Sequence, residues 1–292
     1  MTEKSPLFDI WPLRHLPRRG PVVAVLPLNG VIGRMGGMRR GLNLADLSSR
    51  IERMFRTRRL SAVALSVNSP GGAPVQSALI AGRIRALAEE KNVPVYTFIE
   101  DVGASGGYWL ACAGDEIYAQ PSSIVGSIGV VSGGFGFAEM IDKLGIERRL
   151  HTAGEKKAML DPFGPEKPAD VKHLKALQKE IHEDFIAMVR ARRADRLTAS
   201  DKILFSGAFW TGTKAVELGL IDGLGDIRTI MRASFGDKVR FKVFGERRSF
   251  LQRRFGTAAN TSAETPEEWG GDFAAGVLAA AEERLWWNRF GL

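Results

Sequence analysis

Short apolar runs alternate with segments of helical periodicity along this chain, and two of the runs end in glycine-rich turns. The runs at 22–26, 63–67 and 93–99 have the length and composition of buried strands. Apolar residues recur at helical spacing in 44–55 and again in 75–90. Because strands that alternate with helices usually pair in parallel, this order predicts an α/β fold with a mostly parallel sheet.

The remainder of the chain continues this alternation. A long amphipathic helix is expected over 169–195, with an apolar face formed by Val171, Leu174, Leu177, Ile181, Phe185 and Met188. We expect short strands near 116–119, 128–131, 146–152 and 241–244, and helices near 136–144 and within 211–234. The length of 292 residues suits one domain with added ends. We place an irregular N-terminal arm at 1–20, the domain at 21–250, and a linker with a C-terminal amphipathic helix at 251–292.

The bulk composition excludes several classes of function. The single cysteine, Cys112, cannot form an intrachain disulfide or a cysteine-based metal site, and its apolar neighbours indicate a buried side chain. The formal charge is +8, with arginines crowded between positions 34 and 59, which could serve nucleic acid or an anionic membrane. No zinc-finger spacing or RNP-type aromatic signature is present. We therefore expect a solvated basic surface and no nucleic-acid partner.

The N-terminal residues do not resemble a secretory signal. Asp9, Pro12, Arg14 and Pro17 interrupt the apolar residues there, which leaves no signal-peptide core. The sequence also has no run of about 18 apolar residues, the length that a membrane-spanning helix needs. The sequence predicts a cytoplasmic location, or one peripheral to a membrane.

Ser105 lies between glycines, directly after a predicted strand and at the start of a predicted helix. Glycines allow unusual backbone angles and let a substrate approach the hydroxyl closely. A helix N-terminus also offers free N–H groups that suit an oxyanion. The loop 68–72 follows another buried strand, and Gly72 could supply a second N–H donor. The alternative is an ordinary N-cap serine beside an ordinary turn.

A nucleophilic serine needs a base, and two kinds are available. His151 ends a predicted strand and is the only histidine suited to a triad, since His173 and His182 occupy positions of the long helix that look solvated. Lys156 and Lys157 are the alternative, because a lysine acts as a base when burial or positive neighbours lower its pKa. In an extended segment only one of the two lysines can face the site. The apolar residues 158–160 could form a desolvating wall beside it.

Five segments together resemble the S49 peptidases, the signal peptide peptidase A family, which has the ClpP/crotonase fold of ββα units. They are 66–74 (SVNSPGGAP), 104–111 (ASGGYWLA), 124–130 (IVGSIGV), 157–162 (KAMLDP) and 210–225 (WTGTKAVELGLIDGLG). The resemblance covers about residues 20–235, and the segments stand in the family's order.

The resemblance implies a serine peptidase with a Ser-Lys dyad. Carried onto the matching positions, it implies that Ser105 is the nucleophile, Lys157 the general base, and Ser127 the residue that orients this lysine. It implies an oxyanion hole made by Gly72 and Gly106. It implies no metal or organic cofactor.

The resemblance also implies partners. Such peptidases form ring-like homo-oligomers whose sites are completed between neighbours, and they cleave short or unfolded hydrophobic peptides such as spent signal peptides. Family members often carry an N-terminal membrane anchor, which this sequence does not show. The C-terminal helix could replace it as a peripheral membrane contact or could dock on a neighbouring subunit, through Phe273, Val277, Leu278, Leu285, Trp286 and Phe290.

Three other functions fit parts of the pattern. The segment 103–107 satisfies the G-x-S-x-G pattern of α/β-hydrolases, but a second oxyanion loop of the His-Gly-Gly type is missing. A crotonase-like acyl-CoA enzyme would need the two N–H donors but no Ser-Lys pair. A catalytically silent scaffold of the same fold would need neither.

Overall fold

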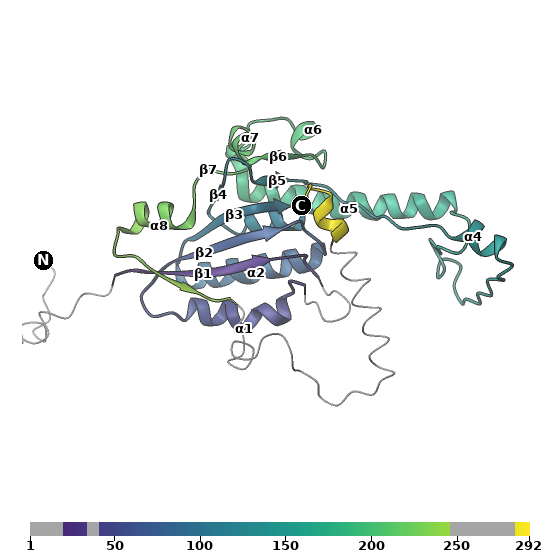
Figure 1. Ribbon diagram of the computed structural model, residues 1–292, viewed down its shortest axis with the longest axis horizontal. Helices are drawn as coiled ribbons and strands as arrows, with labels where there is room; N and C mark the ends of the chain where they lie inside the picture. Colours follow the sequence, from purple (N-terminus) through teal and green to yellow (C-terminus); the bar gives the residue numbers. More distant parts are fainter. Residues whose placement is uncertain (1–19, 34–40, 246–283) are drawn as a thin grey trace, which may run out of the picture.

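The computed structural model describes residues 20–33, 41–245 and 284–292. Its centre is an eight-stranded sheet with the path β6-β5-β3-β2-β1-β8, in which β4 pairs with β3 and with β7 (Figure 1). Every pairing is parallel except the one between β5 and β6. The strands are β1 (Val22–Asn29), β2 (Leu60–Ser69), β3 (Val95–Ala104), β4 (Glu116–Ala119), β5 (Ile124–Gly126), β6 (Phe209–Thr211), β7 (Gly223–Leu224) and β8 (Arg240–Val243). The predicted α/β class with a mostly parallel sheet is confirmed.

Helices cover both faces of this sheet. They are α1 (Leu44–Phe55), α2 (Pro74–Lys91), α3 (Gly106–Ala111), α4 (Ala138–Lys143), α5 (Pro168–Arg193), α6 (Asp201–Leu204), α7 (Gly212–Glu217) and α8 (Ile227–Phe235). On one face, Ile51 of α1 and Ile84 of α2 pack against Leu65 of β2. On the other, Met231 of α8 packs against Ala64. Leu65 and Ala64 are neighbours in β2 and thus pack on opposite faces of the sheet, because successive side chains of a strand alternate between its two faces.

The segment 130–167, which we call the projecting segment, extends away from the sheet. Figure 1 shows α4 beyond the far end of α5, and most residues of this segment are exposed. It has contacts of its own, including an Arg148–Asp161 ion pair of 3.3 Å and neighbouring rings of Phe137 and Phe163. Its apolar side chains are largely uncovered: Val131, Phe135, Met140, Leu144, Ile146 and Leu150 are each at least 46% exposed.

Three sequence-based expectations differ from the structure. Residues 128–131 and 146–152 are not strands, and in the projecting segment no strand of the sheet is within reach to pair with 146–152. The apolar face expected for the long helix holds only near its C-terminal end. Phe185 and Val189 are buried there, whereas Leu177 and Ile181 on the outer part remain exposed.

The C-terminal end of α5 is fixed tightly to the domain. Arg193 is 1% exposed, donates to both carboxylate oxygens of Asp222 at 2.8 and 3.0 Å, and also donates to the carbonyl of Gly219. The neighbouring Arg192 donates through Nε to the carbonyl of Cys112, directly after α3. The long helix is therefore anchored beside the short helix that follows Ser105.

Candidate active site

Ser105 joins β3 to α3 in a strained backbone conformation. Its φ is 53° and its ψ is −123°, a region that residues other than glycine rarely occupy. Its N–H donates to the carbonyl of Gly126 on β5 at 2.8 Å. Its side chain makes no capping hydrogen bond to α3, and typical N-cap residues have β-region angles instead. Ser105 thus occupies the N-cap position of α3 without capping the helix through its side chain, and its backbone forms a sharp strand-to-helix turn.

Glycines make room for this turn. A Cβ on Gly71 would lie 2.8 Å from the Cβ of Ser105, and one on Gly107 would lie 2.3 Å from the carbonyl oxygen of Ser69. Gly71 also has a φ of +109°, which favours glycine. The loop after β2 and the start of α3 can approach this closely only because both are glycine-rich.

Gly72 and Gly106 lie side by side next to Ser105. Gly72 forms a parallel bridge with Ile32, in which the N–H of Ile32 donates to Gly71 and the N–H of Ala73 donates back to Ile32, each at 2.8 Å. In such a bridge the N–H of the middle residue points away from the partner. A Cβ on Gly106 would lie 3.3 Å from the nitrogen of Gly72. The two expected oxyanion donors are thus brought together, although their role stays a prediction.

Ser127 lies one residue beyond the carbonyl that holds Ser105. It is 2% exposed, also has a φ of 53°, and its N–H donates to the carbonyl of Ala208 at 2.7 Å. It borders a cavity of about 300 Å³, whose other lining residues are Gly129, Val130, Val131, His182, Ser206, Gly207 and Arg289. Ser127 is therefore placed to meet a polar group that enters this cavity.

The predicted base is not beside Ser105 in the single chain. Lys157 and Lys156 are exposed in a turn of the projecting segment, so the extended conformation expected there is wrong. Within the described ranges, no hydrogen bond joins either lysine to Ser105 or Ser127. The expected apolar wall does not form either, because Leu160 is 37% exposed. The lysine pair and Ser105 lie in separate parts of the chain.

The expected burial of Cys112 is confirmed, and the alternative base His151 loses its support. Cys112 is 1% exposed, and burial raises the pKa of its thiol to about 12, so it stays protonated and inaccessible. His151 is exposed and ends no strand, which removes the reason for considering it.

Sequence reasoning missed His182. It is half-buried on α5, and its Nε2–H donates to the carbonyl of Ile128 at 3.1 Å. The signal was present in the helical register, since His182 precedes the buried Phe185 by three residues and Val189 by seven.

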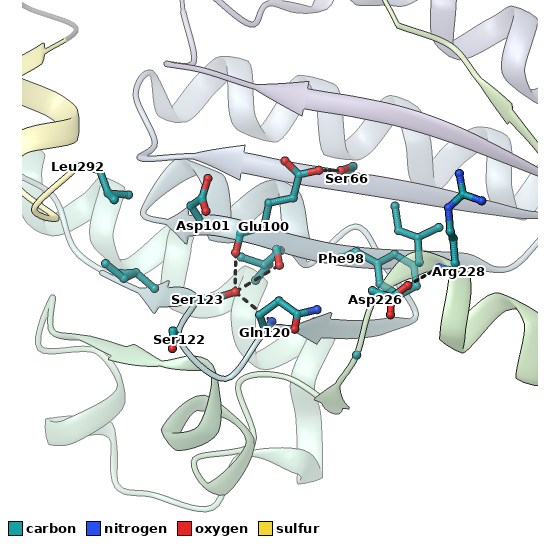
Figure 2. A pocket seen from close by; sticks show the side chains of 14 residues that line it. Ser66, Phe98, Glu100, Asp101, Gln120, Ser122, Ser123, Asp226, Arg228 and Leu292 are labelled. Atoms are coloured by element: carbon teal, nitrogen blue, oxygen red, sulfur yellow. Dashed lines mark hydrogen bonds between the residues drawn. The ribbon is translucent and has the colours of Figure 1, made fainter.

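A cavity of about 530 Å³ (Figure 2) is lined by residues of β3, of the turn before β5 and of the start of α8, and not by Ser105. Glu100 and Asp101 of β3 border it, and Ser123 donates to the backbone carbonyl of Glu100. Asp226 lines the opposite side, where it caps α8. The cavity holds no predicted catalytic residue.

The last residues of the chain pack on the end of β3. Residues 284–288 are helical, and Phe290 is 7% exposed against Val102, Ala104 and Ile124. Phe290 therefore faces its own chain and not a membrane or a neighbour. Leu285 of the expected apolar face remains exposed, while Phe273, Val277 and Leu278 lie outside the described residues.

The family described as Peptidase family S49 matches residues 87–237. The chain belongs to this family. The match begins within α2 and includes Ser105, Ser127 and Lys157. Together with the parallel sheet, membership confirms the expected ClpP/crotonase-like class, and it removes the α/β-hydrolase alternative.

Proteins with different names are similar in sequence to this chain. A Brucella abortus protein named Na(+)/H(+) antiporter NhaA is 50% identical over 285 residues, which are 96% of this chain and 39% of that protein. A protein of Enterococcus faecium assigned as a signal peptide peptidase SppA is 30% identical, over 70% of this chain and 60% of its own length. The chain thus spans less than two thirds of either relative. A solved structure of a membrane-bound stomatin-specific protease with a substrate peptide matches at TM-score 0.49 and 14% identity, over 80% of this chain and 96% of that chain.

One further structural finding concerns helices that could span a membrane. In the part of the chain that the structure describes, no helix combines the length and the hydropathy needed to cross a bilayer.

Proposed function

We propose that this chain is a serine endopeptidase in which Ser105 is the nucleophile and Lys157 the general base. The observation that carries the proposal is the strained turn at Ser105, which sets the serine beside the neighbouring N–H groups of Gly72 and Gly106. Strain of this kind persists where the surrounding structure over-determines it, and it clusters at active sites. Membership of a peptidase family supports the same activity.

The reaction is acyl transfer to Ser105. A neutral Lys157 accepts the proton of the hydroxyl, and Oγ attacks the carbonyl carbon of a peptide bond. The N–H groups of Gly72 and Gly106 donate to the resulting oxyanion. The lysinium then protonates the leaving amine, and water hydrolyses the acyl-enzyme by the same steps. No metal or organic cofactor takes part.

We infer that Lys157 reaches this site from a neighbouring copy of the chain. Ser127 is almost fully buried and borders a cavity of about 300 Å³. Lys157 lies on the projecting segment, whose apolar side chains are uncovered. Apolar surface of that extent is typical of protein–protein contacts. A homo-oligomeric ring would cover it and deliver the lysine to Ser127.

The proposed substrates are short or unfolded hydrophobic peptides, including cleaved signal peptides. The signal peptide peptidase name of the Enterococcus relative supports this choice. Contact with the periphery of a membrane stays a hypothesis.

The direct test combines a peptide library with a fluorophosphonate probe. The wild-type chain should cleave library peptides and carry the probe on Ser105, whereas Ser105→Ala should lose both. Lys157→Ala should lower turnover by about 10³-fold or more, and Lys156→Ala should not, because only one lysine orients on Ser127. Unchanged cleavage by Ser105→Ala would sink the proposal, and the reverse order of the two lysine variants would move the base to Lys156. A wild type with neither cleavage nor adduct would indicate a silent scaffold.

A further inference from the structure

Three successive residues at the end of β5, from Gly126 to Ile128, are each held by a different part of the domain. The carbonyl of Gly126 accepts from Ser105 N–H at 2.8 Å. The N–H of Ser127 donates to Ala208 at 2.7 Å. The carbonyl of Ile128 accepts from the His182 ring at 3.1 Å. The short segment 126–128 is thus fixed at consecutive peptide groups.

This segment links the two serines of the proposed mechanism. Ser105 and Ser127 are both at φ 53°, where a side chain is strained. The Ile128 carbonyl lies in the planar peptide group between Ile128 and Gly129, so a rotation of that group turns Ile128 and shifts the neighbouring Ser127. A change at Ser127 in turn moves the Gly126 carbonyl that holds Ser105. The contact from His182 is therefore coupled to the position of the nucleophile.

His182 is the one side chain among these three contacts. The bonds from Ser105 and to Ala208 join backbone groups, which a substitution does not remove. A carbonyl only accepts, so the bond assigns the ring proton to Nε2. The ring also borders the cavity next to Ser127. It comes from α5, whose Arg192 holds the carbonyl at the end of α3.

We propose that His182 is a positioning residue of the active site. Through the carbonyl of Ile128 it fixes the segment 126–128, and with it the geometry of Ser127 and Ser105. The proposal rests on the proposed function for its catalytic consequence, but the backbone coupling can be measured without any turnover.

The kinetic test compares His182→Leu, which removes the donor, with His182→Gln, which retains an N–H donor. Because a small misplacement of a reacting group is costly, His182→Leu should lower kcat and the rate of fluorophosphonate labelling by about 10- to 100-fold, with KM changed less than about threefold. His182→Gln should restore kcat to within about threefold of wild type. His173→Leu is the matched control, since His173 is exposed on the same helix, and it should behave as wild type.

The structural test measures amide hydrogen exchange. In His182→Leu, the amides of Ser105 and Ser127 should exchange at least about tenfold faster while amides of β1 and β2 stay as protected as in wild type. Wild-type protection in His182→Leu, or a His182→Gln variant as impaired as His182→Leu, would overturn the proposal. An inactive wild type would contradict the proposed function alone, because the exchange result still decides the role of His182.

Discussion

At the scale of single residues, the proposed site contains positive φ angles, which are unfavourable for residues that have a Cβ atom. Ser105 has a φ of 53°, and Gly71 and Gly72 on the facing loop have values of +109° and +141°. Each conformation of this kind costs about 1–3 kcal/mol in a residue other than glycine. The glycines thus remove strain from the loop, and within the proposed site the strained residues are Ser105 and Ser127.

Gly71→Ala should disable the site. The new methyl group would lie 2.8 Å from the Cβ of Ser105 and would strain a φ of +109°, so the loop and the nucleophile must move apart. A displacement of this size should lower kcat/KM by about 100-fold or more, measured with a peptide substrate.

The matched control for that variant is Gly82→Ala in α2. Nothing lies within 4 Å of a Cβ there, and alanine is the better helix former. Gly82→Ala should leave kcat/KM unchanged and stabilise the fold by about 0.5–1 kcal/mol. Equal activity of the two variants would contradict the close approach of the loop to Ser105.

The residues of the site were predictable to different degrees. Ser105, Gly72 and Gly106 follow from local sequence, because a strand, a glycine-rich turn and a helix start fix their neighbourhood. Lys156 and Lys157 were candidate bases from their residue type, and the choice of Lys157 rests on the resemblance, because the segment has no local signal for the turn it adopts. His182 was misplaced because the apolar pattern of the long helix was read along its whole length.

At the scale of elements, α5 is the helix that joins the separate parts of the subunit. Its C-terminal end is buried through Arg193 and Asp222, and its outer half carries exposed Leu177 and Ile181. The pattern of a long amphipathic helix predicts its bounds well. The same pattern cannot tell which turns of the helix are buried by the rest of the chain and which remain exposed. Residues 146–152 were mistaken for a strand for a related reason, because apolar content alone does not provide a pairing partner.

Arg193→Met should destabilise the fold strongly. Removing the guanidinium takes the buried cation from Asp222, which keeps the Ile117 N–H and the half-exposed Arg196, and takes the donor from the Gly219 carbonyl. Breaking a buried pair of this kind costs about 3–5 kcal/mol. Urea unfolding at pH 7 measures this loss. Lys214→Met is the control, because the Lys214–Glu217 pair is more than half exposed and is worth at most about 1 kcal/mol. Similar losses in both variants would show that the Arg193 pair does not anchor α5.

At the scale of the whole molecule, one subunit holds the parts of the site without assembling them. The sheet and the β2 loop fix Ser105, Gly72 and Ser127 in one place. The projecting segment carries Lys157 elsewhere and exposes apolar side chains. The parallel sheet followed from the order of strands and helices. The separation of serine and lysine did not follow from that order. It supports the proposal, implied by the family resemblance, that neighbouring copies complete each other's sites.

The most direct test of this account mixes two inactive variants. Ser105→Ala and Lys157→Ala should each be inactive alone, and each should assemble as wild type does. When they are co-expressed with different tags and purified through both, sites that take serine from one variant and lysine from the other are intact. Random assembly then predicts about a quarter of the wild-type peptidase rate. Co-assembled particles without activity would contradict a site shared between subunits, and activity in either variant alone would contradict the Ser105–Lys157 dyad.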